Sequence, residues 1–137
     1  MKKQEGITLI ALVITIIVLL ILAGVTIAML TGENGLLTRA SSTQTAVEEG
    51  KARDVVSLAI NEVKIDILDP TVTDNSKKVM SAANVVAKIN AKPNQLEGTV
   101  AASGSNITIT GTDTTITVAL TISGDNATIA SVTTTDN

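Results

Sequence analysis

The 137-residue sequence contains no cysteine, no histidine and no aromatic residue. Without cysteine, no disulfide can stabilise the fold and no thiolate can act as a nucleophile. Without histidine, the commonest general base and a frequent metal ligand are missing, and no serine or carboxylate pair has the spacing of an active site. Without aromatic rings, stacking on single-stranded nucleic acid is disfavoured. We therefore expect no enzyme activity, no cofactor or metal, and no direct nucleic-acid binding.

Charge is also missing from a long segment near the N-terminus. Residues 7–30 contain no Asp, Glu, Lys, Arg, Asn or Gln. These roughly 24 residues exceed the ~20 that a helix needs to cross a bilayer. Lys2 and Lys3 precede the segment, which favours a cytoplasmic N-terminus. We expect residues 7–30 to form an apolar transmembrane helix.

The next residues predict a break and then a second, amphipathic helix. Two glycines and an asparagine fall within residues 31–35, and such residues weaken or end a helix. The helix predicted over residues 36–69 stops before Pro70, which cannot continue it. Its apolar residues recur at the three- and four-residue spacing of one helical face. They are Val56, Ala59, Ile60, Val63 and Ile67.

Residues 70–137 predict a small globular head with one short helix and an antiparallel sheet. The helix is expected over residues 77–90, with Val79, Met80, Ala83, Val86 and Ala87 facing inward. From residue 97 the apolar period changes to two, which is typical of half-buried strands near residues 99–102, 106–110, 114–122 and 127–133. A disordered, glycosylated stalk would not need this regular alternation. The fold class is therefore α+β, with the apolar face of the sheet packed on the amphipathic helix.

The first residues carry a more specific pattern. The sequence KKQEG precedes ITLIALVITIIVLLILAGVTIAML, so Gly6 separates a short charged leader from the apolar run. A secretory signal peptide has a shorter run, of about 7 to 15 residues, and a simple membrane anchor would not require Gly6. The pattern resembles the class III signal of type IV prepilins. Its continuation LTGENGLLTRA is similar to pilin-like proteins of Gram-positive, clostridia-like bacteria, and the resemblance covers about the first 40 residues closely.

This resemblance implies a processing site and a mode of assembly. In that family a prepilin peptidase cuts after the glycine, here Gly6, so residues 1–6 form a leader peptide. The new N-terminal residue, here Ile7, is N-methylated. The mature chains then polymerise through their apolar helices, with an assembly ATPase and a platform membrane protein as further partners. The resemblance thus implies a structural subunit that lies in the cytoplasmic membrane before assembly and in an extracellular, homopolymeric filament afterwards.

One residue departs from the family pattern. The fifth residue of a mature pilin is usually Glu, which pairs with the N-terminal amine of a neighbour, and this chain has Ala11 there. The amine of Ile7 would then have to use Thr8 or backbone carbonyls. Some minor pilin-like subunits also lack the glutamate. The alternatives are therefore a minor pilin, a pseudopilin of a DNA-uptake or secretion system, or a permanently membrane-anchored surface domain.

Two groups of charged residues are weaker candidates for a function. One group consists of Asp66, Asp69 and Asp74, whose oxygens suit calcium, although carboxylates at a helix end before a proline turn are more often solvated. The other group consists of Glu48, Glu49, Lys51 and Arg53. It is interpreted as an exposed charged face, whose ion pairs between subunits would each contribute about 0.2–1 kcal/mol.

Overall fold

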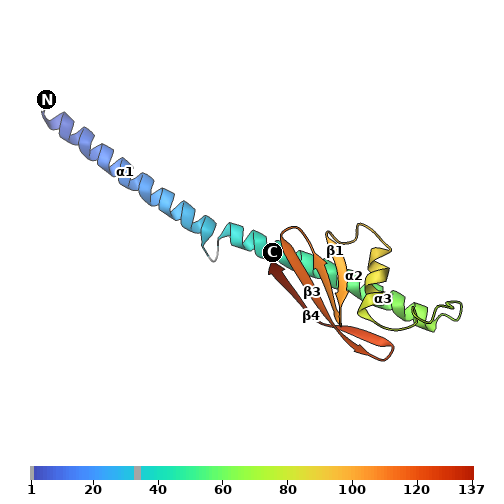
Figure 1. Ribbon diagram of the computed structural model, residues 1–137. Coiled ribbons are helices and arrows are strands. Elements are labelled where there is room, and N and C mark those ends of the chain that lie inside the picture. The colour runs from blue at the N-terminus through green and yellow to red at the C-terminus, as the bar shows by residue number, and fades with distance from the viewer. Residues whose placement is uncertain (1, 33–34) are drawn as a thin grey trace. The chain divides into compact units, whose positions relative to one another are not determined.

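The computed structural model describes residues 2–32 and 35–137, shown in Figure 1. Two compact units divide the chain, residues 1–44 and residues 45–137. The helices are α1 (Lys2–Thr31), α2 (Leu36–Leu68) and α3 (Ala82–Asn90). The strands are β1 (Thr99–Ser103), β2 (Asn106–Thr110), β3 (Thr114–Ser123) and β4 (Asn126–Asp136). The predicted α+β class, with a long N-terminal helix and a small antiparallel sheet, is confirmed.

The first unit is dominated by α1, a continuous helix drawn in blue in Figure 1. Threonine hydroxyls in its uncharged segment are hydrogen-bonded within the helix. The hydroxyls of Thr15 and Thr26 each donate to the carbonyl oxygen four residues earlier, at 2.7 Å. Such bonds satisfy a hydroxyl inside its own helix, which an apolar environment requires. A break was predicted over residues 31–35; Glu33 and Asn34 lie outside the described residues, α1 ends at Thr31 and α2 begins at Leu36.

In the second unit, α2 contributes one face to the core. The buried residues of α2 are Ala52, Val56, Ala59, Ile60 and Val63. They pack in one hydrophobic cluster with buried residues of α3 and the strands. Four of these five positions were predicted from the helical spacing, and the predicted Ile67 is half-buried against the same cluster. The helix ends at Leu68, two residues before Pro70.

The sheet is a four-stranded antiparallel meander in the order β1-β2-β3-β4. Its inner face holds the buried side chains Ile107, Ile109, Ile116, Val118 and Leu120, and the alternate residues point away from the core. The β1–β2 and β3–β4 hairpins turn through Gly104 and Gly124, with φ of 61° and 57°. Glycine adopts this left-handed conformation without strain and suits the first central position of a two-residue hairpin turn.

The short helix differs from the prediction. It begins at Ala82, because the Ser81 side chain accepts a hydrogen bond from the backbone N–H of Asn84 and caps the helix. Residues 75–79 form turns and bends instead. The prediction that Val79, Ala83 and Ala87 face inward was therefore wrong, since all three are exposed. Met80 and Val86 are buried as predicted, and the helix also buries Ala82, Val85 and Ile89.

Candidate functional site

Helix α1 is the candidate functional site, and its uncharged segment starts at a glycine. Gly6 lies inside α1, and a Cβ atom built there would have no heavy atom within 4 Å outside its own helix backbone. The neighbours Glu5 and Ile7 are exposed, Ile7 by 68%. The two residues singled out for processing, Gly6 and Ile7, are therefore adjacent on an open helical surface. That accessibility is what a peptidase acting between them would require.

The apolar side chains of α1 are exposed along the helix. Every residue from Gln4 to Thr31 is exposed, including all the Ile, Leu and Val side chains between Ile7 and Leu30. A continuous exposed apolar surface of this size marks a membrane or protein interaction site. Among the described residues, one helical stretch is long and apolar enough to cross a membrane, and it lies near the N-terminus. By length and composition, α1 could therefore span a membrane.

The first residues of the uncharged segment, from Ile7 onward, hold few groups that could bind an amine. Ala11 is exposed, and its only acceptor is its backbone carbonyl oxygen. This oxygen already accepts a hydrogen bond from the hydroxyl of Thr15. The hydroxyl of Thr8 donates to the carbonyl oxygen of Gln4 at 2.9 Å. The acceptor of this bond therefore lies within residues 1–6.

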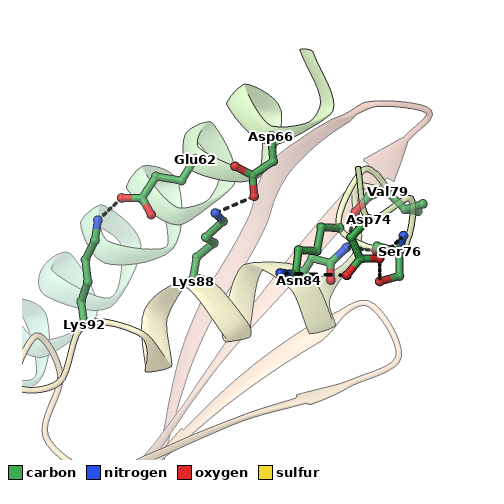
Figure 2. A network of polar contacts seen from close by, with 9 residues as sticks. Glu62, Asp66, Asp74, Ser76, Val79, Asn84, Lys88 and Lys92 are labelled. Atoms are coloured by element: carbon green, nitrogen blue, oxygen red, sulfur yellow. Dashed lines mark hydrogen bonds and ion pairs between the residues drawn. The ribbon is translucent and has the colours of Figure 1, made fainter. Parts of the chain in front are cut away.

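The carboxylates weighed as calcium ligands lie in separate local interactions. Asp66 pairs with Lys88 of α3 at 2.5 Å, and the neighbouring Glu62 pairs with Lys92 (Figure 2). Asp74 accepts hydrogen bonds from the hydroxyl and backbone N–H of Ser76. Within residues 2–32 and 35–137, no group of three or more acidic, histidine or cysteine side chains is arranged to hold a metal ion. Asp66 and Glu62 thus join α2 to α3 and to Lys92 just after it, whereas Asp74 bonds within its own loop.

Two local turns lower carboxylate pKa values in the loop after α2. The hydroxyl of Thr71 donates to Asp69 Oδ1 at 2.6 Å and its backbone N–H donates at 2.8 Å, which together lower the pKa of Asp69 below 3.8. Ser76 makes the same pair of bonds to Asp74, and these lower the pKa of Asp74 as well. Hydrogen bonds to a carboxylate favour its charged form. Both groups are thus held ionised by their own turns.

The face expected from Glu48, Glu49, Lys51 and Arg53 is only partly exposed. Lys51 and Arg53 are exposed, but Glu48 and Glu49 are half-buried. Glu49 accepts a hydrogen bond from the hydroxyl of Thr134 at 2.6 Å, and Glu48 accepts one from Thr114 at 3.4 Å. Each bond joins α2 to a strand more than sixty residues later. The two glutamates are therefore structural, and sequence spacing gave no indication of their partners.

Comparison with known proteins gives no family assignment: no family model, no curated protein and no solved structure matches the chain. The function must therefore be inferred from the residues themselves. The strongest features are the exposed apolar helix α1 and the glycine between its charged start and its uncharged body.

Proposed function

We propose that this chain is a structural subunit of a type IV pilus-like surface filament. The observation that carries the proposal is the placement of Gly6 between a leader that contains Lys2, Lys3 and Glu5 and a long uncharged segment of α1 whose apolar side chains are exposed. The leader orients the helix in the cytoplasmic membrane, because basic residues remain on the cytoplasmic side. A peptidase then cuts after Gly6, and the subunits polymerise into an extracellular filament.

Polymerisation through α1 is physically reasonable because lipid and neighbouring helices are both apolar surroundings. Exchanging one for the other costs little hydrophobic free energy, so packing and hydrogen bonding decide the outcome. The hydroxyls of Thr15 and Thr26 are satisfied within the part of α1 that remains after cleavage, by the carbonyl oxygens of Ala11 and Leu22, and need no water in either environment. The same helix can therefore serve first as a membrane anchor and then as part of a filament core.

Cleavage after Gly6 also changes the hydrogen bonding of the new N-terminus. The cut removes Gln4, whose carbonyl oxygen accepts the hydroxyl of Thr8. Thr8 would then be the second residue of the mature chain, next to the N-methylated amine of Ile7. Its freed hydroxyl is a polar group that can hydrogen-bond the amine of a neighbouring subunit where Ala11 provides no carboxylate.

This proposal includes three cellular partners and two successive locations. The partners are a prepilin peptidase, an assembly ATPase and a platform membrane protein, as the resemblance of residues 1–40 implies. The subunit lies in the membrane before assembly and in a surface filament afterwards. The main contact of the mature chain is with further copies of itself.

A matched pair of glycine substitutions tests the proposal. Gly6→Leu should abolish cleavage, leaving Met1 as the N-terminus and no sheared filaments, whereas Gly24→Leu should leave cleavage intact. Both glycines lie in α1 with no heavy atom within 4 Å of an added Cβ outside the helix backbone, so the variants differ mainly in distance from the cleavage site. The measurement is N-terminal mass spectrometry of cell-surface material. An intact Met1 in the unsubstituted protein, co-expressed with a complete export system, would contradict the proposal and support a permanent anchor.

Ala11 favours one variant of the proposal, in which the chain is a minor pilin or pseudopilin. A minor subunit needs fewer identical contacts along the filament, so loss of the carboxylate-amine pair is less costly. The composition of sheared filaments separates the two cases. Filaments made mainly of this chain indicate a major pilin, and filaments that contain it only as a trace component indicate a minor one.

A further inference from the structure

The outward face of the sheet has an unusual composition. In the register of the four strands, its residues form rows across the sheet, for example Thr99, Thr110, Thr115 and Thr135 in one row. All positions of this face are Thr, Ser, Asn or Ala. They are Thr99, Ala101, Ser103, Asn106, Thr108, Thr110, Thr115, Thr117, Ala119, Thr121, Ser123, Asn126, Thr128, Ser131, Thr133 and Thr135. We call this set the threonine face.

The threonine face is uncovered and carries no charge. Each of its positions is exposed or half-buried, and the half-buried ones lie on the two central strands. Among the described strand residues that point outward, none is Asp, Glu, Lys or Arg. The rest of this unit is highly charged, with seven basic and eleven acidic residues between 45 and 137. The charged residues of the unit lie on helices, loops and turns, apart from Asp136 in the last position of β4.

We propose that the threonine face is a self-association surface that packs face to face on the threonine face of a second copy. Two acidic units repel each other when their charged surfaces meet, and the threonine face is where they can approach without like charges in contact. Small side chains allow two flat sheets to pack at the usual spacing of about 10 Å. Threonine supplies both a methyl group for packing and a hydroxyl for hydrogen bonds across the contact. A carbohydrate partner is less favoured, because the face has no aromatic ring on which a sugar could stack.

The size of the face predicts how strong this contact is. With strands about 4.8 Å apart and 3.4 Å per residue, two five-residue and two longer strands cover a footprint of about 500 Å². Two copies would bury about 1,000 Å² in total, which is at the lower limit of a specific interface. One contact is therefore weak, but many copies held in a row on a membrane or filament would act together. The contact would join two surfaces that each display many copies of the chain.

This inference does not depend on filament formation, since α1 can hold the chain in a lipid bilayer without processing. The experiment uses the full chain reconstituted in phosphatidylcholine vesicles, with clustering of vesicles followed by light scattering. Vesicles that carry the unsubstituted chain should cluster as protein density rises. Unsubstituted vesicles that stay dispersed at high protein density would overturn the inference. Binding of those dispersed vesicles to immobilised neutral polysaccharide would instead identify a carbohydrate partner.

Charge substitutions then test which surfaces meet. Thr110→Lys combined with Thr133→Lys should lower the clustering rate at least tenfold, because like charges would face each other across the contact. The two sites are exposed and are not paired with each other in the sheet, so the lysines do not meet within one chain. The matched control is Ala83→Lys with Ala87→Lys, which adds the same charge to exposed positions of α3 and should cluster normally.

A mixing experiment identifies the second copy as the occupant. Vesicles that carry the Thr110→Glu, Thr133→Glu variant should also fail to cluster alone, but should cluster when mixed with vesicles that carry the Thr110→Lys, Thr133→Lys variant. Loss of clustering without recovery in the mixture would contradict face-to-face packing. Far-UV circular dichroism of each variant establishes that it is folded before clustering is compared. The N-terminal mass spectrometry described above is unaffected by any of these outcomes, so this inference and the proposed function can fail separately.

Discussion

Helix α1 and the unit of residues 45–137 contain the same kinds of apolar side chains in opposite situations. In α1 these side chains surround the helix on all sides and are exposed along its described length. In the second unit they recur on one face of α2 and α3 and at alternate strand positions, and they form one buried cluster. The arrangement of apolar residues therefore decides whether they stabilise a fold or form a surface for another partner.

Because of this difference, the two regions depend on different contacts for their stability. The second unit buries its apolar area within one chain, so its folding depends on each core side chain. The apolar side chains of α1 are exposed instead, so their contribution to stability depends on what surrounds the helix. A large-to-small substitution in the core of the second unit should therefore strongly weaken the folding of that unit. The same type of substitution in α1 should hardly change it.

The largest contrast is expected from a pair of isoleucines. Ile107→Ala removes a side chain with 0% exposure from the core and should lower the free energy of unfolding by about 2–5 kcal/mol. Ile17→Ala replaces a side chain of α1 that is 50% exposed. This substitution should change the free energy of unfolding of the second unit by less than about 0.5 kcal/mol. The measurement is amide hydrogen exchange of β3 in the full chain in detergent micelles. Similar losses in both variants would mean that α1 contributes to the core of the second unit.

A smaller contrast concerns hydroxyls that bond to the backbone. Ser81→Ala removes the cap of α3 and should destabilise the second unit by about 1 kcal/mol. Thr26→Ala removes a hydroxyl that bonds within α1, to the carbonyl of Leu22, and should leave the second unit unchanged. Faster amide exchange in α3 of the Ser81 variant alone is the expected result. Unchanged exchange there would show that packing of Val85 and Ile89 positions α3 without the cap.

Sequence patterns were sufficient where the determining interactions are local. The three- and four-residue spacing predicted the buried face of α2, and the alternation from Ile107 onward predicted the inner face of the sheet. The start of α3 was missed because Val79 and Met80 continue an apolar pattern, while the cap at Ser81 sets the true boundary. Serine immediately before an apolar helical segment was a usable indication of that boundary.

For the candidate site too, local features could be predicted from the sequence and long-range contacts could not. The uncharged length after Gly6 is a local property, so the apolar helix could be predicted from the sequence directly. The bonds of Glu48 and Glu49 to the strands could not, because they join residues more than sixty positions apart. The threonine face also required the strand register, since only the register shows that its residues lie side by side.

The smallest expected effect is a dependence of stability on pH, which should be found in the second unit and not in residues 7–30 of α1. Residues 7–30 of α1 contain no titratable side chain, whereas Asp69 and Asp74 in the second unit have pKa values below 3.8. A carboxylate with a lowered pKa in the folded state stabilises that state above its unfolded pKa, and this contribution is lost as pH falls through the folded pKa. Stability from these two groups should therefore stay constant from neutral pH to about pH 5 and decline progressively below it. In carboxyl NMR titrations, Thr71→Val should raise the pKa of Asp69 toward 3.8 and leave Asp74 unchanged, because the substitution removes only the hydroxyl donor to Asp69. A parallel rise of the Asp74 pKa would show that the two turns are coupled. The helicity of residues 7–30 in micelles should not change over the same pH range, because these residues contain no titratable side chain.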